Sequence, residues 1–200
     1  MKYLIGIDEA GRGPLAGPVA VGAAMVKSGF DWSLVGGIRD SKKLTALARE
    51  RYFREMQKLQ REGDLKFAVV LASHSMIDEK GSTAAVRYAI AEVLDTLDPD
   101  PLESGVFLDG LLSAPVWFKH QQTIIGGDDV LPIISLAAIA AKVTRDRYMV
   151  RLSRRYPSYG FDMHKGYGTR THREAIQKFG LSIVHRTTYC SRLFSPVAGV

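Results

Sequence analysis

The sequence contains very little cysteine. Cys190 is the single cysteine among 200 residues, which excludes an intramolecular disulfide and a zinc site built from cysteines. This usage is typical of a reducing compartment, and we expect a cytoplasmic protein. We interpret Cys190 as an inert packing residue rather than a nucleophile.

Long hydrophobic runs are also absent. The longest apolar-rich stretch, residues 130–143, is too short to span a bilayer and is typical of a buried helix, so no membrane association is expected. Met1 and Lys2 lead directly into a strand-like run, and we therefore expect no signal peptide. The sequence has no Gly-x-x-x-x-Gly-Lys-Ser/Thr motif, which argues against a P-loop nucleotidase.

The composition favours one basic α/β domain. Lys and Arg number 27 against 21 Asp and Glu, a formal net charge of +6, which suits an anionic partner such as nucleic acid. Hydrophobic residues make up 46% of the chain, enough for a sizeable core. We expect a single domain over residues 1–200, with residues 156–190 as a small helical C-terminal portion and 191–200 as a tail.

The most informative stretch reads Ile-Gly-Ile-Asp-Glu-Ala-Gly-Arg-Gly-Pro, residues 5–14. An apolar run over residues 3–7 predicts a strand, and Asp8 and Glu9 follow at once. These carboxylates point to opposite sides if the strand continues, but both can face one site if it ends there. The adjoining Gly11-Arg12-Gly13 offers close backbone approach and a planar set of five donors. The combination can hold a metal ion beside a phosphodiester, although a solvated turn is the plainer alternative.

Strand and helix patterns alternate along the rest of the chain. Further strands are predicted at 18–26, 65–72 and 106–109, with short candidates at 116–118 and 123–125. Helices are predicted after Ser73, from Thr45 to about 61, over 82–97, over about 131–155, and from a capping box at Thr171 to Gly180. We expect the second strand to lie antiparallel to the first, under an element that packs closely on its small residues.

Three helices carry specific expectations about burial. In the helix after Thr45, five residues should face the core: Leu47, Tyr52, Phe53, Met56 and Leu59. The helix over 82–97 should bury a stripe of Val86, Ile90, Val93, Leu94 and Leu97. The long helix after Pro132 should be buried as far as Val143 and then leave the core at Thr144-Arg145-Asp146-Arg147.

Further acids stand at the ends of other elements. Asp109 follows an apolar strand and precedes glycine, so it should meet Asp8 if the two strands are parallel neighbours. Asp128 and Asp129 precede the long helix, where the helix dipole alone favours a carboxylate. The four acids Asp8, Glu9, Asp109 and Asp128 offer hard oxygen ligands without cysteine, and such a set favours Mg²⁺ or Mn²⁺. Two such ions can activate a water and stabilise the leaving oxygen of an in-line displacement.

Two basic segments are candidate phosphate contacts. Ser41-Lys42-Lys43 lies just before a helix. The loop over residues 164–170 combines Lys165 and other basic residues with glycines and Tyr167, which could stack on a ribose or base. Solvated surface charge is the alternative for both segments.

Together these motifs resemble those of type 2 ribonucleases H, the bacterial ribonuclease HII family. The matching pieces follow the family's order over about residues 3–189: 6–14, 40–44, Ser73-His74 with Ile77-Asp78 and Gly81, Asp109-Gly110, Gly127-Asp128, 141–147, 164–169 and His185-Arg186. The resemblance implies a ribonuclease H-like fold, an α/β mixed β-sheet flanked by α-helices with a small helical C-terminal portion. It further implies cleavage of RNA in RNA–DNA hybrids and on the 5′ side of single ribonucleotides in duplex DNA, which leaves 3′-hydroxyl and 5′-phosphate ends.

The resemblance also implies roles for individual residues. Asp8, Glu9, Asp109 and Asp128 would bind Mg²⁺ or Mn²⁺, and Asp146 matches a further acid near the site. Gly11, Arg12, Gly13 and Tyr167 match elements that read the ribose 2′-hydroxyl, Lys42 matches a phosphate contact, and Lys165 is a further substrate-binding candidate. We expect a monomer whose partners are RNA–DNA hybrids and ribonucleotide-containing duplex DNA.

The chain departs from the family pattern at Asp129-Val130-Leu131-Pro132, at Ala138 and at Leu111. These departures bear on the phosphate contacts beside the fourth acid, on metal preference and on turnover. Asp129 is a rival for the fourth ligand, and we choose Asp128 because it lies 14 residues before Lys142, the family's spacing. Two other functions are considered, a non-catalytic nucleic-acid-binding module and a phosphotransferase of small anions. The latter leaves both glycine-rich basic loops unexplained.

Overall fold

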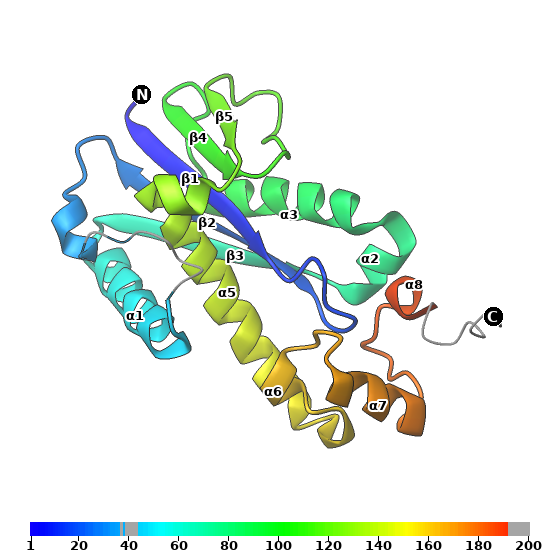
Figure 1. Cartoon of the computed structure of the whole chain (residues 1–200). Coiled ribbons are helices and arrows are strands. Elements are labelled where there is room, and N and C mark those ends of the chain that lie inside the picture. The colour runs from blue at the N-terminus through cyan, green and yellow to red at the C-terminus, as the bar shows by residue number, and fades with distance from the viewer. Residues whose placement is uncertain (37, 39–43, 192–200) are drawn as a thin grey trace.

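Five strands form one mixed sheet in a computed structural model that describes residues 1–36, 38 and 44–191 (Figure 1). The strands are β1 Tyr3–Ala10, β2 Val19–Lys27, β3 Leu65–Ala72, β4 Ser104–Asp109 and β5 Gln121–Ile124. Their order across the sheet is β3-β2-β1-β4-β5. β2 lies antiparallel to β1, as predicted, and to β3, whereas β4 is parallel to both β1 and β5.

Helices cover both faces of this sheet (Figure 1). The α-helices are α1 Ala46–Glu62, α2 His74–Lys80, α3 Ser82–Leu97, α4 Gly127–Val130, α5 Pro132–Ser153, α6 Phe161–His164, α7 Arg170–Phe179 and α8 Thr187–Cys190, and the 3₁₀ turns are η1 Trp32–Val35 and η3 Pro157–Tyr159. α2 and α3 pack on one face, and α1 and α5 on the other. The predicted α/β architecture, a mixed sheet flanked by helices, is therefore confirmed.

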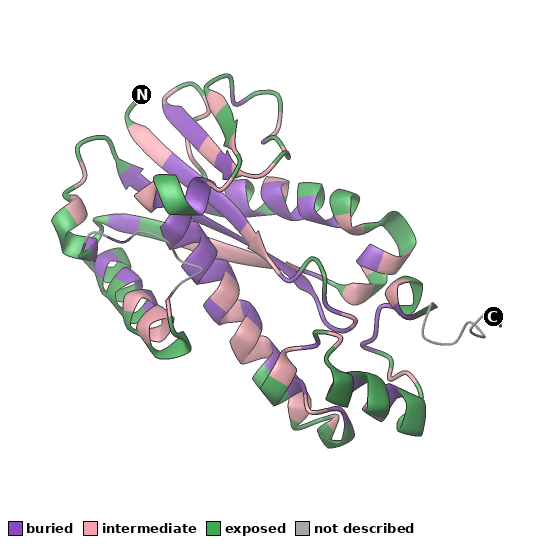
Figure 2. Ribbon diagram, in the orientation of Figure 1, coloured by how far each residue is buried: buried purple, intermediate pink, exposed green. Residues whose placement is uncertain are grey.

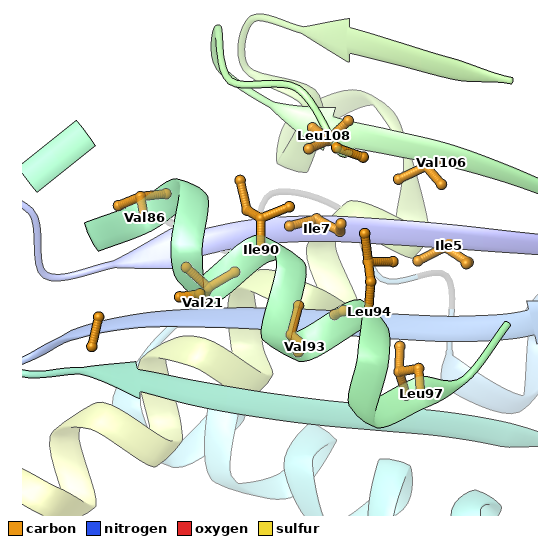
Figure 3. Close-up of a cluster of buried hydrophobic side chains, with 14 of the residues drawn as sticks. Ile5, Ile7, Val21, Val86, Ile90, Val93, Leu94, Leu97, Val106 and Leu108 are labelled. Atoms are coloured by element: carbon orange, nitrogen blue, oxygen red, sulfur yellow. The ribbon is translucent and has the colours of Figure 1, made fainter. Parts of the chain in front are cut away.

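The core under α3 follows the predicted apolar stripe. Ile5 and Ile7 of β1 pack in one cluster with Val86, Ile90 and Leu94 of α3 (Figure 3). All five side chains are at most 3% exposed. Burying an aliphatic side chain of this size contributes about 1.5–3 kcal/mol. This cluster fixes β1, and with it the residues at the end of that strand.

On the opposite face, α5 lies directly on β1 and β2. The approach is so close that a Cβ atom on Gly22 would lie 2.4 Å from the backbone oxygen of Ala137. Glycine and alanine in β2 are therefore needed to seat the helix, as the sequence predicted. The first half of α5 is buried, whereas its second half runs away from the sheet (Figure 2).

α1 begins and ends as predicted, but one of its residues was assigned to the wrong side. The Thr45 hydroxyl accepts a hydrogen bond from the Ala48 N–H at 3.2 Å, and Gly63 closes the helix at φ 86°. Phe53 is buried, whereas Leu47 is 77% exposed. At 100° per residue, Leu47 lies roughly 120° around the helix from Phe53, so it faces solvent.

Three further predictions were wrong in detail. Residues 116–118 form no strand. The apolar Phe118 packs into the core under α3 instead. The neighbouring strand is β5 over Gln121–Ile124 rather than 123–125. α7 starts before the expected Thr171, because the Thr169 hydroxyl caps it by accepting from the His172 N–H at 3.3 Å.

The C-terminal helices pack around the outer half of α5. Met149 and Leu152 of α5 join Phe161, Ile176 and Cys190 in a third buried cluster. Burial raises the pKa of the Cys190 thiol to about 11, so the thiol is protonated at neutral pH, in line with a packing role. Among the described residues, none of the helices has the length and apolar character to cross a membrane.

Candidate active site

Asp8 and Glu9 lie within β1, which continues to Ala10. The strand therefore does not end at the acid pair, and the two residues differ in burial. Asp8 is 6% exposed, whereas Glu9 is half-buried. Both nevertheless line one cavity of about 380 Å³ at the end of the strand.

Asp109 of β4 comes close to Asp8 without lining this cavity, and Asp128 of α4 lines it. β4 is parallel to β1 with Leu108 opposite Ile7, so Asp109 follows at the level of Asp8. The Asp109 Oδ1 accepts a hydrogen bond from the Gly127 N–H at 2.8 Å, which fixes the start of α4. The next residue, Asp128, is fully buried and lines the cavity with Asp8.

Asp128 and Asp129 differ clearly in position. Asp129 is exposed and does not line the cavity that Asp8, Glu9 and Asp128 share. The Asp128 carbonyl accepts from the Ser135 hydroxyl at 2.5 Å, which ties this turn to α5. The geometry thus places Asp128 toward the other acids and Asp129 toward the surface.

The acids affect one another electrostatically. Burial, followed by the negative charges of Asp109, Glu9 and Asp128, holds the pKa of the Asp8 carboxyl well above its usual range. The Glu9 N–H donates to Asp8 Oδ1 at 2.6 Å and partly offsets this effect. A divalent cation would relieve the repulsion, since all four side chains supply the hard oxygen ligands that Mg²⁺ and Mn²⁺ prefer.

The four carboxylates are of the right chemical type to bind such an ion, but they are not already arranged around an ion position. Within residues 1–36, 38 and 44–191, no group of three or more acidic, histidine or cysteine side chains is already arranged to hold a metal ion. The carboxylates would therefore have to adjust around an ion.

A buried arginine from the C-terminal portion holds the loop after β1. Arg186 donates from Nη2 to the Gly11 carbonyl at 2.7 Å and from Nη1 to the Arg12 carbonyl at 2.7 Å. Its Nε donates to the Gly17 carbonyl at 2.9 Å. Arg186 is fully buried, and burial lowers its pKa to about 10. The Gly11 and Arg12 carbonyls are thus already bonded inside the protein, which leaves donors of this loop for a ligand.

Arg145 holds the same loop from α5. Its Nε donates to the Pro18 carbonyl at 2.8 Å, and it is fully buried, so the prediction that this part of α5 leaves the core is wrong for Arg145. Gly11, at φ 91°, is required here, because a Cβ atom would lie 2.0 Å from Arg145 Nε. Both arginines lie in pieces that match the family, but sequence reasoning gave neither of them a role, because their partners are backbone carbonyls, which carry no side-chain signal.

Arg12 and Tyr167 flank the acids on the surface. The Arg12 guanidinium is 42% exposed and lies 3.3 Å from Glu9 Oε1. Tyr167 is 42% exposed and lines the cavity. Lys142 Nζ and the Arg145 guanidinium each lie 5.8 Å from the centre of its ring, a cation–π arrangement that favours this ring position.

Asp146 and Lys165 are not gathered with the four acids. They line a second cavity of about 380 Å³, which among the described residues has only Arg49 in common with the first. Asp146 accepts from Lys142 Nζ at 2.8 Å, and Lys165 Nζ donates to the Asp162 carbonyl. Sequence reasoning did not assign Arg49 or Lys142, which bring positive charge to the wall of the first cavity. Lys42 lies outside the described residues.

Comparison with known proteins matches the chain to a family. The family model described as Ribonuclease HII matches residues 5–192. A Ribonuclease HII of Caldicellulosiruptor bescii is 38% identical over 97% of this chain and 89% of its own length. One of Geobacter sulfurreducens is 41% identical over 94% of this chain and 82% of its own.

A solved structure agrees. The crystal structure of ribonuclease H2 from Pyrococcus horikoshii OT3 superposes with a TM-score of 0.75 at 26% identity, covering 96% of both chains. The chain therefore belongs to the ribonuclease HII family and is an endonuclease of the hydrolase class with ribonuclease H activity on RNA–DNA hybrids.

Proposed function

We propose that this enzyme cuts on the 5′ side of single ribonucleotides embedded in duplex DNA as well as within RNA–DNA hybrids, by metal-assisted hydrolysis. The observation that carries the proposal is the convergence of Asp8, Glu9 and Asp128 on one cavity with the loop that begins at Gly11. Acids beside a donor-rich loop suit a phosphodiester next to a ribose, because cations offset phosphate charge and the 2′-hydroxyl distinguishes RNA from DNA.

In this proposal the four acids Asp8, Glu9, Asp109 and Asp128 hold Mg²⁺ or Mn²⁺, with two ions during the reaction. The bound ions would activate water and stabilise the leaving oxygen. The water oxygen forms a bond to phosphorus, and the bond between phosphorus and the 3′ oxygen breaks. One water proton ends on that oxygen, so the products carry a 3′-hydroxyl and a 5′-phosphate.

The rest of the cavity wall would position the ribonucleotide. Gly11, Arg12 and Gly13 present donors to the 2′-hydroxyl. Arg186 supports this arrangement because it donates to the Gly11 and Arg12 carbonyls and so holds the loop in place. The exposed ring of Tyr167 stacks against the sugar or base at the junction with DNA. Lys165 contacts a phosphate outside the carboxylate cavity, and Lys42 supplies a further phosphate contact. Asp146 keeps Lys142 in place through their 2.8 Å ion pair.

The test uses one DNA duplex with a single ribonucleotide and the matching all-DNA duplex, each incubated with Mg²⁺, Mn²⁺ or EDTA. We expect cleavage only of the ribonucleotide duplex and only with metal, giving a 3′-hydroxyl that a polymerase can extend and a 5′-phosphate that a phosphatase can remove. Metal-independent binding without products would instead indicate a binding module. Products with a 2′,3′-cyclic phosphate would overturn the hydrolytic route.

A further inference from the structure

Two buried histidines and one half-buried histidine form a cluster next to the loop that carries Tyr167. His172 and His185 are at most 1% exposed, and their Nε2 atoms lie 3.1 Å apart. The ring of His164 stacks on that of His172, with the ring centres 4.3 Å apart. Nothing in the proposed reaction uses these rings, although Tyr167 lies three residues from one and five from another.

The hydrogen bonds fix the proton positions on two of the rings. His172 Nδ1 lies 2.9 Å from the Tyr167 carbonyl, which can only accept, so Nδ1 carries the proton. In a neutral ring, His172 Nε2 is then an acceptor, and the facing His185 Nε2 must be the donor. His185 Nδ1 is left to accept, and the Ser182 N–H donates to it at 2.9 Å.

The opposite arrangement fails at the Tyr167 end. If His185 donated from Nδ1 to the Ser182 carbonyl at 3.3 Å, His172 would have to donate from Nε2. Its unprotonated Nδ1 would then face the Tyr167 carbonyl, acceptor against acceptor. A buried pair of this kind costs about 1–3 kcal/mol. Burial also lowers the pKa of His172 and His185 to about 4, in keeping with neutral rings.

We infer that His185 and His172 form a one-directional hydrogen-bond relay, from the Ser182 N–H to the Tyr167 carbonyl, that positions Tyr167 for ribonucleotide recognition. Both histidines act as positioning residues, because neither lines the carboxylate cavity. The inference rests on the role of Tyr167 in the proposed function.

Other bonds hold the neighbouring backbone, so that the relay acts on a nearly fixed loop. The Gly166 N–H donates to His164 Nδ1 at 3.2 Å, and the Gly166 carbonyl accepts from the Leu15 N–H at 2.8 Å. The Tyr167 carbonyl also accepts from the Thr169 N–H at 2.8 Å. The bond from His172 is therefore its second one, and it links α7 and, through His185, the segment after α7 to the Tyr167 peptide. Loss of the relay should therefore move this residue without unfolding the domain.

Three substitutions at His172 distinguish the effect of the ring's shape on activity from the effect of its hydrogen bonds. His172→Phe keeps a ring but loses both bonds, and we expect kcat/KM on a single-ribonucleotide duplex to fall about tenfold. His172→Asn places an amide N–H near the Nδ1 position and should restore activity to within about threefold of wild type. His172→Gln keeps only the His185 side and should behave like His172→Phe. Equal activity of the Phe and Asn variants would overturn the relay.

A double-mutant cycle with Tyr167 distinguishes positioning from general damage. In the Tyr167→Ala background, His172→Phe should cause no further loss, because the group that it positions is gone. A further tenfold loss would overturn the relay while leaving the proposed role of Tyr167 intact. Wild-type cleavage by Tyr167→Ala would instead overturn that role.

Nitrogen-15 NMR of the imidazole rings tests the proton positions without any substrate. At pH 7 we expect His172 protonated at Nδ1 and His185 protonated at Nε2. The reverse tautomers, or a positively charged ring in either residue, would overturn the relay whatever the kinetic result.

Discussion

Acidic and basic side chains are buried in two different ways in this molecule. At the carboxyl ends of β1 and β4, acids crowd together, and their mutual repulsion contributes to the raised pKa of Asp8. In the C-terminal portion, Arg186 is buried just as completely but donates to three carbonyls. In the first region, repulsion between the acids destabilises the folded protein, and a bound cation can relieve this repulsion. In the second region, the buried arginine stabilises a loop. Replacing the buried charged side chain should therefore have opposite effects on stability in the two regions.

The largest expected effect is on activity at the acidic end. Asp8→Asn should lower kcat by at least about a thousandfold, equal to roughly 4 kcal/mol, because a metal ligand is lost. The free energy of unfolding should stay unchanged or rise by about 1 kcal/mol, since burial of one crowded charge is removed. Cleavage assays and urea unfolding of the same sample measure both quantities.

The control for this prediction is Asp95→Asn, which removes an exposed acid on α3 and should change neither quantity. Full activity in Asp8→Asn would refute the ligand role. A large loss of stability would refute the repulsion argument instead.

The basic region should respond in the opposite direction. Arg186→Lys keeps the charge, but one ammonium group cannot reach the Gly11, Arg12 and Gly17 carbonyls in the same geometry. We expect the free energy of unfolding to fall by about 3 kcal/mol, as buried hydrogen bonds from a charged group are lost.

Arg170→Lys is the matched control, because Arg170 is 91% exposed and paired with Glu174. Its effect should stay below about 0.5 kcal/mol. Similar losses of unfolding free energy in Arg170→Lys and Arg186→Lys would show that the buried Arg186 contributes no more to stability than an exposed arginine.

The histidine cluster gives a smaller effect that depends on pH. Burial lowers the pKa of His172 to about 4 from an ordinary value of 6.5, so between these values the unfolded chain binds more protons than the folded one. Stability is therefore lost as the pH falls from about 6.5 toward 4. The charged forms of His164 and His185 face His172 and add to this cost.

Urea unfolding at pH 7 and pH 5 measures this effect. The loss of stability between the two pH values should shrink by roughly 1 kcal/mol in His172→Asn. The exposed His120 provides the control, and His120→Asn should leave the difference unchanged. An unchanged difference in His172→Asn would show that the histidine is not held neutral by the fold.

The smallest effect is expected at the exposed neighbour of the fourth acid. Asp129→Asn should change kcat by less than about twofold, since surface charges are screened by solvent. Asp128→Asn should match Asp8→Asn in its loss of activity. A larger loss at Asp129 than at Asp128 would reverse the choice of ligand.

The sequence predicted the acidic region better than the basic one, and the reason is physical. Strand patterns are local, so β1 and β4 could be located, although β1 continues past the acid pair to Ala10. A parallel pairing brought Asp8 and Asp109 together. The small residues of β2 likewise predicted the close approach of α5.

Features that depend on distant backbone atoms could not be predicted in this way. Arg145 looked like the start of an exposed helix end, yet it donates to the Pro18 carbonyl, 127 positions away in the chain. Phe118 resembled part of a strand because burial and strand formation favour the same residue types. The family resemblance marked Arg186 as a matching residue but gave no reason for its burial.

The crowded acids should form a binding site for a divalent cation, and a Mn²⁺ titration monitored by calorimetry measures this binding. The wild-type protein should bind Mn²⁺ and gain thermal stability from it, whereas Asp8→Asn and Asp109→Asn should bind far more weakly. Asp129→Asn and Asp95→Asn should bind as the wild type does. Equal Mn²⁺ binding by wild type and the Asp8→Asn and Asp109→Asn variants would show that the acids are not a cation site.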